Sequence, residues 1–260
     1  MRRLDLKTMI SEVLLFQPQL WLLAKEARRK VRRNREAEEA LVPLLVRPNA
    51  VAIDVGANRG IYTKIMLTRT RNVICIEPNP ENSRVLERVF GKDVRVITGA
   101  ASNRNMDVVL RIPDVSSGSA TIEEENLFLS GAFKTIRVKA FRIDDLKLEN
   151  VSFIKIDVEG HELSVLEGAL ETLKKNRPSI LLEAEERHRA RAVATVREFL
   201  ELLGYEGYMI EGGVLVSIRR FDPTIHQSVE AAQQRRLTGR HGDLYINNFI
   251  FLPTLPLGDG

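Results

Sequence analysis

The sequence contains one cysteine, Cys75, among 260 residues. A single thiol cannot form a disulfide within the chain, so a disulfide framework is excluded and a reducing compartment is expected. Cys75 lies inside an apolar run, which is typical of a buried structural thiol rather than a nucleophile.

Long apolar runs are also missing. Residues 9–30, MISEVLLFQPQLWLLAKEARRK, contain apolar patches, but Glu12 and Pro18 interrupt them and no small-residue cleavage site follows. No run approaches the ~20 apolar residues of a membrane-spanning helix. We therefore expect a soluble, cytoplasmic protein without a secretory signal peptide.

Positive charge is concentrated in one segment, although the formal net charge is only +4. Residues 25–35, KEARRKVRRNR, are mostly basic, with Glu26 as the one acid. Such a run is usually a solvated helix face, and the alternative is contact with an anionic membrane surface or an acidic partner. We expect no nucleic-acid partner, because aromatic residues are not interleaved with the basic ones and no binding motif is present.

Two regions differ in their apolar pattern. Residues 1–48 have the spacing of amphipathic helices, divided at Pro18, and predict an N-terminal helical extension. Residues 49–253 alternate short apolar runs with helical patterns, which predicts an α/β domain around a mostly parallel sheet with helices on both faces.

The core of this domain has a regular rhythm. Strands are expected at 50–56, 72–78, 94–101, 151–157 and 179–185, the first two of them buried. Helical patterns follow near 60–70, 82–90, 159–175 and 190–204. Right-handed crossovers place the first three strands side by side in the order third, second, first. The tail has three more strand patterns, with no long helix expected between the last two.

An insertion interrupts this rhythm after the third strand. Residues 106–112 and 134–143 alternate apolar and polar side chains, which predicts a half-exposed antiparallel strand pair. The segment between them is rich in serine and glycine, and we expect it to form a long loop over the site.

The first chemical motif is IDVGANRG, with Asp54, Gly56, Asn58 and Gly60 at the end of a strand. Glycine there allows a tight turn and close approach of a ligand to the backbone, and the next helix directs its N–H groups at that ligand. Glu77 follows roughly twenty residues later at the tip of the second strand, where a carboxylate can hold ribose hydroxyls.

The spacing favours S-adenosylmethionine over NAD. A dinucleotide turn needs glycine where this chain has Asn58, since a pyrophosphate lies on bare backbone there. S-adenosylmethionine has no phosphate. Its carboxylate could accept helix N–H groups, and Asp54 or loop carbonyls could accept from its ammonium group. A glycine turn without any ligand is the remaining interpretation.

A second motif is FIKIDVEGHELSVLEGAL, in which Asp157, Glu159, His161 and Glu162 gather at the end of the fourth core strand. A hydroxyl group needs a base to become a good nucleophile at neutral pH, and histidine has an ordinary pKa near neutrality. We predict Asp157, Glu159 and His161 as catalytic residues.

Each of these residues also has a structural interpretation. Asp157 could pair with Lys155 or cap the helix. Glu159 could be stabilised by the dipole of the helix that follows, and His161 could donate to a backbone carbonyl. A salt link to a neighbouring helix is the expected role of Glu162.

A metal is the alternative to a base. Asp157 and Glu183 could hold Mg²⁺ between adjacent strand tips, and Glu185 lies close by in the sequence. His226, His241 and Asp243 have no ligand spacing, and we expect no resident metal site.

Four segments, VAIDVGANRGIYTK, VICIEPNPENSRVLE, FIKIDVEGHELSVLEGA and PSILLEAE, together resemble the FkbM family of S-adenosylmethionine-dependent methyltransferases over roughly 38–203. The resemblance implies a seven-stranded class I methyltransferase sheet in the order 3-2-1-4-5-7-6, with the last strand antiparallel. It also implies methyl transfer to oxygen, often a hydroxyl of a glycan or another polyhydroxylated small molecule.

The resemblance implies cofactor contacts as well. Gly56, Asn58 and Gly60 correspond to the loop at the methionine end, Glu77 to the ribose ligand, and Pro78 follows it as in the family. The adenine is expected at 99–102, including Ala100, where the Asp of many class I enzymes is missing.

Two other functions remain as alternatives: a non-catalytic module that binds S-adenosylmethionine, and an NAD-dependent Rossmann oxidoreductase or epimerase. Base methylation is disfavoured, because DVEG stands where an Asn/Asp-Pro-Pro-aromatic run is expected. The sequence does not predict the acceptor, the oligomeric state, or the roles of the N-terminal helices and the loop 222–243.

Overall fold

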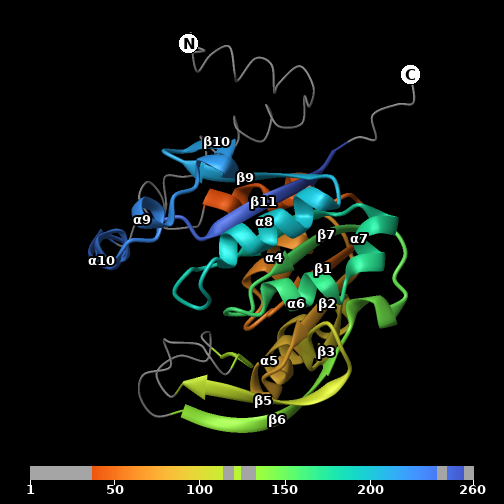
Figure 1. Cartoon of the computed structure of the whole chain (residues 1–260). Helices are drawn as coiled ribbons and strands as arrows, with labels where there is room; N and C mark the ends of the chain where they lie inside the picture. Colours follow the sequence, from red (N-terminus) through yellow and green to blue (C-terminus); the bar gives the residue numbers. More distant parts are fainter. Residues whose placement is uncertain (1–36, 114–119, 124–132, 239–244, 255–260) are drawn as a thin grey trace, which may run out of the picture.

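A computed structural model describes residues 37–113, 120–123, 133–238 and 245–254 (Figure 1). Most of the predicted N-terminal extension, including the basic run 25–35, lies outside the described residues, as do His241 and Asp243. The boundary between extension and domain at residue 48 stays a prediction. The described segment before it, η1 (Ala37–Ala40) and α3 (Val42–Leu45), packs Leu41 and Val42 into the core.

The main sheet has eight strands in the order β10-β9-β11-β8-β7-β1-β2-β3. From one edge to the other these are β10 (Val214–Ser217), β9 (Tyr205–Glu211), β11 (Asn248–Pro253), β8 (Ser179–Glu183), β7 (Val151–Ile156), β1 (Val51–Val55), β2 (Val73–Glu77) and β3 (Val94–Thr98). β11 runs antiparallel to both of its neighbours. The expected fold class and strand order are therefore confirmed, and β10 adds one edge strand to the seven expected.

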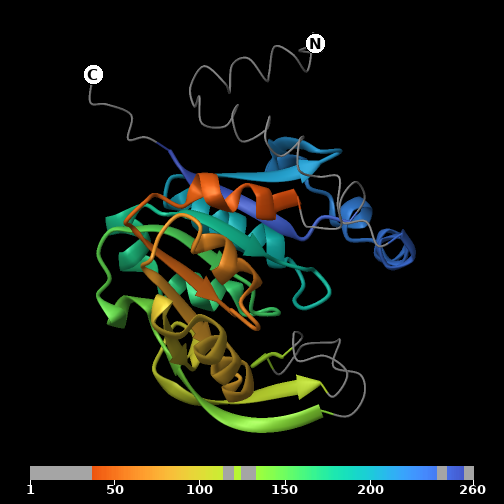
Figure 2. The ribbon, with the colours of Figure 1, turned by 180° about the vertical axis from the view of Figure 1, so that it is seen from behind.

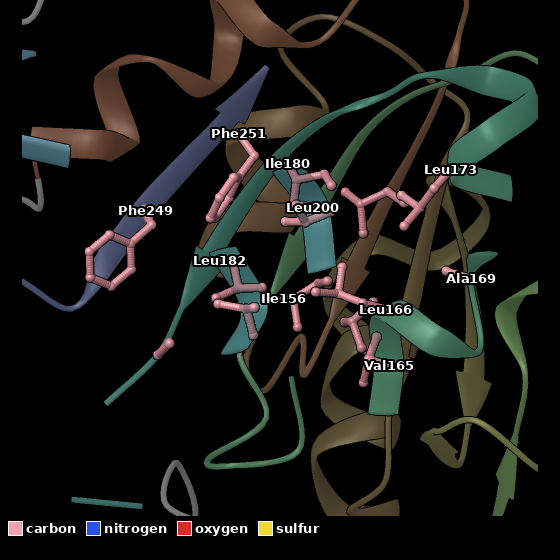
Figure 3. Close-up of a cluster of buried hydrophobic side chains, with 14 of the residues drawn as sticks. Ile156, Val165, Leu166, Ala169, Leu173, Ile180, Leu182, Leu200, Phe249 and Phe251 are labelled. Carbon is pink, nitrogen blue, oxygen red and sulfur yellow. The ribbon is translucent and has the colours of Figure 1, made fainter. Parts of the chain in front are cut away.

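Helices cover both faces of the sheet, as buried apolar strands require. Figure 1 shows α6 (Glu162–Glu167), α7 (Leu170–Asn176) and α8 (Ala192–Leu202) on one face. Figure 2, from behind, shows α3, α4 (Ile61–Met66) and α5 (Pro80–Phe90) on the other. In Figure 3, Ile156 and Leu182 from the sheet meet Val165 and Leu166 from α6, which holds α6 against the end of β7.

The predicted antiparallel pair is present and belongs to a second, three-stranded sheet. β5 (Met106–Pro113) pairs with β6 (Phe133–Phe141) along its whole length, and the short β4 (Ala100–Ala101) pairs with β6 on the other side. The pair extends past the β3 edge of the main sheet beside α5 (Figure 1). Leu110, Val138 and Ala140 form its own small core with Ala100.

The helix predicted over 159–175 is broken at Gly168 into α6 and α7. A Cβ atom on Gly168 would lie 1.9 Å from the Ser102 carbonyl oxygen, so the residue must be glycine for the two backbones to meet. At this break, the end of α6 packs against Ser102, the residue that follows β4.

The remaining elements are helical. They are η2 (Gly91–Asp93), η4 (Ile143–Leu146), η5 (Ile218–Arg220), α9 (Pro223–His226) and α10 (Val229–Thr238). The last two lie between β10 and β11. With ten residues, α10 is nearly as long as α8, so the expectation of no long helix there was wrong. In the described parts of the chain, no helix combines the length and apolarity needed to cross a membrane.

Candidate active site

A cavity lies where the carboxyl ends of β1, β2 and β7 face the inserted sheet. Seven of the ten predicted site residues line it: Gly56, Asn58, Glu77, Pro78, Ala100, Asp157 and His161. Leu110, Ala120, Thr121 and Ile122 from the insertion form another part of the wall. The volume of the cavity is about 50 Å³, room for a few water molecules. The predicted loop over the site is thus observed in its described part.

The turn after β1 presses against the end of β7. Gly56 has a φ of 75°, and a Cβ on it would lie 1.8 Å from the Asp157 carbonyl oxygen. Only glycine permits this approach. Asn58 also has a left-handed φ of 46°, and its buried Oδ1 has no hydrogen-bond partner among the described residues. The cavity wall thus contains an amide oxygen that could accept a hydrogen bond from a ligand.

Glu77 joins two loops at the tip of β2, and it is only 4% exposed. Its Oε2 accepts from the Asn58 backbone N–H at 2.7 Å, and its Oε1 accepts from the Asn79 N–H at 2.8 Å. Burial raises the pKa of Glu77, and these hydrogen bonds oppose that shift. Each carboxylate oxygen keeps a second lone pair, so Glu77 can still accept from a ligand.

Gly60 lies outside the cavity lining. Its φ is 83°, and a Cβ on it would lie 2.4 Å from the Phe90 ring and 2.9 Å from Leu86. The glycine therefore lets the start of α4 pack on α5. The motif spacing reflects helix packing at this position, while Gly56 and Asn58 face the cavity.

Asp54 lies beneath the turn rather than on the cavity surface. It accepts from Thr63 Oγ1 at 2.6 Å, and in the strand register it stands between Cys75 and Lys155. Burial raises the pKa of Asp54, against the Thr63 hydrogen bond and the charge of Lys155. Lys155 Nζ lies 5.0 Å from the Tyr62 ring centroid, on the α4 side of the sheet.

Cys75 is buried in the same cluster, as predicted from its apolar surroundings. Burial and the neighbouring Asp54 charge raise the pKa of its thiol to about 12. The thiol is therefore protonated at neutral pH and is a poor nucleophile.

His161 lies at the N-cap of α6 with both ring nitrogens engaged. Nδ1 contacts Glu123 Oε1, and Nε2 lies 2.9 Å from Ser102 Oγ. The hydrogen bond to His161 lowers the pKa of Glu123, against the effect of burial, so this carboxyl is ionised at neutral pH. The ring is thus held by two side chains, from the insertion and from the end of β4.

Sequence reasoning missed Glu123. It is the first of three consecutive glutamates in a segment interpreted only as a loop, 38 residues before the histidine that it contacts. An acidic residue in the loop expected to lie over the site was the only available signal.

Glu159 and Glu162 both lie behind the cavity wall. Glu159 pairs through Oε2 with His188 Nε2 at 2.9 Å, and its backbone oxygen accepts from Thr121 Oγ1. Glu162 is 3% exposed and accepts from the Gly160 N–H at 2.7 Å. Burial raises the pKa of Glu162 to about 7. Its main contact is thus a backbone amide, where the sequence suggested a salt link to another helix.

The acids at the end of β8 have their own partners. Asn247 Nδ2 donates to both Glu183 and Glu185, and Glu185 also contacts Arg187 and Tyr245. Within the described parts of the chain, no group of three or more His, Cys, Asp or Glu side chains is arranged to hold a metal ion. His226 accepts from the Asp222 N–H and stacks on Phe221, which accounts for its burial.

The cavity therefore has two chemically different sides. Glu77 and Asn58 offer oxygen acceptors to a polar ligand such as a nucleoside. Asp157 and His161 stand at the end of β7, where a proton could be accepted. Because the turn after β1 touches Asp157, the two sides meet.

Comparisons with known proteins match the chain to methyltransferases. The methyltransferase FkbM domain matches residues 54–207. A 2-O-methyltransferase, NoeI, of Sinorhizobium fredii is 28% identical over 207 residues, covering 68% of this chain and 81% of that protein. A hexuronic acid methyltransferase, AglP, of Haloferax volcanii is 28% identical over 158 residues, covering 55% of this chain and 60% of that protein.

The fold has a solved counterpart. The crystal structure of an FkbM methyltransferase from Methylobacillus flagellatus matches 93% of this chain with a TM-score of 0.50 and 16% sequence identity. This chain spans 60% of that chain's length. At this identity, the match supports the fold alone.

Proposed function

The chain belongs to the methyltransferase FkbM family, and from this premise we propose that it is an S-adenosylmethionine-dependent O-methyltransferase whose acceptor is a sugar or another polyhydroxylated small molecule. The observation that carries the proposal is the cavity itself. Glu77 and Asn58 line it together with Asp157 and His161, which supports a nucleoside site and a proton acceptor in one space.

The residues on the β1 and β2 side fit the cofactor. Glu77 has lone pairs left for two ribose hydroxyls, and Asn58 Oδ1 lacks a partner among the described residues and could accept from an ammonium group. Ala100 and Pro78 offer small apolar surface to an adenine ring. When bound, S-adenosylmethionine supplies a methyl group activated by its sulfonium. Asp54 supports the turn from beneath and pairs with Thr63.

The residues at the end of β7 serve the acceptor. His161 Nε2 is the atom that would accept the hydroxyl proton, since Nδ1 faces Glu123. The Ser102 hydroxyl is hydrogen-bonded to Nε2. It must either move away when the acceptor binds or pass the proton from the acceptor to Nε2. Asp157 would orient the acceptor hydroxyl as a hydrogen-bond acceptor. Holding the reacting groups in line supplies much of the rate enhancement in a displacement of this kind.

A sugar hydroxyl is favoured by the relatives. One is a 2-O-methyltransferase and the other a hexuronic acid methyltransferase, each 28% identical to this chain. We propose an acceptor of this class, without assigning the individual sugar.

The wall contributed by the insertion bears on binding. Ala120, Thr121 and Ile122 line the cavity, so a cofactor that enters it would contact this segment. We expect bound S-adenosylhomocysteine to change the exposure of this segment, which hydrogen exchange would detect.

Calorimetry tests the cofactor site. S-adenosylmethionine and S-adenosylhomocysteine should bind the native chain, while NAD should not, and NAD binding alone would favour an oxidoreductase. Transfer of a labelled methyl group to glycan and lipid fractions then tests the reaction. Cofactor binding without transfer, together with full biological activity of Asp157→Ala and His161→Ala variants, would favour a non-catalytic module.

A further inference from the structure

We propose that Glu123, in the segment between β5 and β6, is the positioning residue of His161 and determines which ring nitrogen accepts the proton. The inference rests on the proposed function, because it assumes that His161 is the base. It adds a residue outside the motifs that predicted the site.

The contacts define the tautomer of His161. An ionised carboxylate can only accept a hydrogen bond, so Nδ1 beside Glu123 must carry a hydrogen. The Ser102 hydroxyl can donate or accept, and therefore adapts to whichever state the other nitrogen has. Glu123 thus leaves the lone pair of neutral His161 on Nε2.

Glu123 is itself held in place. Its backbone N–H donates to Thr121 Oγ1 at 3.1 Å, and Thr121 Oγ1 donates to the Glu159 carbonyl oxygen at 2.9 Å. Thr121 also exchanges two backbone hydrogen bonds with Arg111 of β5. The segment is therefore fastened both to the inserted sheet and to the loop that contains His161.

The loop before His161 is close to this segment. A Cβ on Gly160 would lie 3.6 Å from Glu123 Cγ, an ordinary contact distance, and 3.2 Å from His188 Cβ. The φ of 107° at Gly160 favours glycine at this position. The side chains of His161 and Glu123 are 13% and 28% exposed, so solvent only partly screens their interaction.

Three other charged groups of the described residues bear on the pair. The charge of Arg189 also acts on Glu123, and Asp157 and Glu159 precede His161 on its own loop. Among these, Glu159 pairs with His188, while Glu123 has the direct contact with the His161 ring.

The deciding test is the ring tautomer. Nitrogen-15 NMR of the histidine rings, recorded with S-adenosylhomocysteine present and with the rings neutral, should show the Nδ1–H form in the native chain. Glu123→Gln should shift the tautomer ratio toward Nε2–H by roughly tenfold, the equivalent of one charge-assisted hydrogen bond. Glu123→Asp should restore part of the native ratio. An unchanged ratio in folded Glu123→Gln would overturn the proposal.

A kinetic cycle separates this proposal from the proposed function. Labelled methyl transfer from S-adenosylmethionine to the accepting glycan fraction should fall roughly ten- to a hundredfold in Glu123→Gln, mainly in kcat. In a His161→Ala background, Glu123→Gln should have no further effect. Asp107→Asn, on the exposed outer strand of the inserted sheet, is the matched control and should match the native rate.

The outcomes are distinguishable. Equal losses from Glu123→Gln in both backgrounds would show that Glu123 acts without His161, which overturns the positioning role. Full activity of His161→Ala would instead remove His161 as the base, and the proposed mechanism would fail at that step.

Discussion

Glu162 should make the stability of the protein depend on pH. Burial raises its pKa from 4.5 to about 7. At 1.36 kcal/mol per pKa unit, this shift corresponds to about 3 kcal/mol of folding free energy. Because the folded pKa is the higher one, this stability is fully present below pH 4.5 and is lost as the pH rises through 7.

Glu162→Gln isolates this contribution. The amide oxygen can still accept from the Gly160 N–H, while the buried negative charge is removed. The variant should therefore be more stable than the native chain by ~2–3 kcal/mol at pH 8, with a difference that shrinks toward pH 4.5.

Denaturant unfolding at pH 4.5, 6 and 8 measures the difference. Glu171→Gln is the control, because Glu171 is an exposed acid at the start of α7 whose side chain pairs with Lys174. Its stability difference should stay small and nearly constant with pH. A Glu162→Gln difference that does not change between pH 4.5 and 8 would refute the account of its buried charge.

Three further predictions concern the cavity and its support. Glu77→Ala should weaken S-adenosylmethionine binding by ~1–3 kcal/mol in calorimetry, since a charged acceptor is lost; unchanged affinity in a folded variant would remove Glu77 from the cofactor site. Gly56→Ala should lower both thermal stability and cofactor affinity, because its Cβ would lie 1.8 Å from the Asp157 carbonyl oxygen; native values of both would show that the turn tolerates a side chain. Cys75 should react with iodoacetamide at pH 8 only after unfolding, given its burial and its pKa of about 12; rapid labelling of the native protein would contradict this.

The sequence predicted those site residues that belong to short motifs at the ends of strands. Gly56, Asn58 and Glu77 lie at strand ends within short motifs, and strand ends of a parallel sheet meet at one edge. Crossover handedness accounts for the first three strands, and the family resemblance for the rest of the strand order. The tail pattern predicted β10 as a strand, whereas the family resemblance implied only seven strands in the main sheet.

Contacts across long sequence separations could not be predicted. Glu123 reaches His161 over 38 residues through a loop without periodic pattern, and Ser102 reaches it over 59. Gly60 matches the motif but serves packing on Phe90. Spacing alone does not separate these two uses of a glycine, because both require a position without a side chain.

Ser102 touches both ends of α6: its hydroxyl meets the His161 ring, and its carbonyl oxygen lies against Gly168. Asn103, the next residue, donates to Glu167 on the same helix. The inserted sheet and α6 therefore form one structural unit, and a chimeric protein would need both parts to match. An exchange of residues 99–142 between relatives would retain the geometry around the histidine only if the recipient also supplied a glycine at the end of this helix.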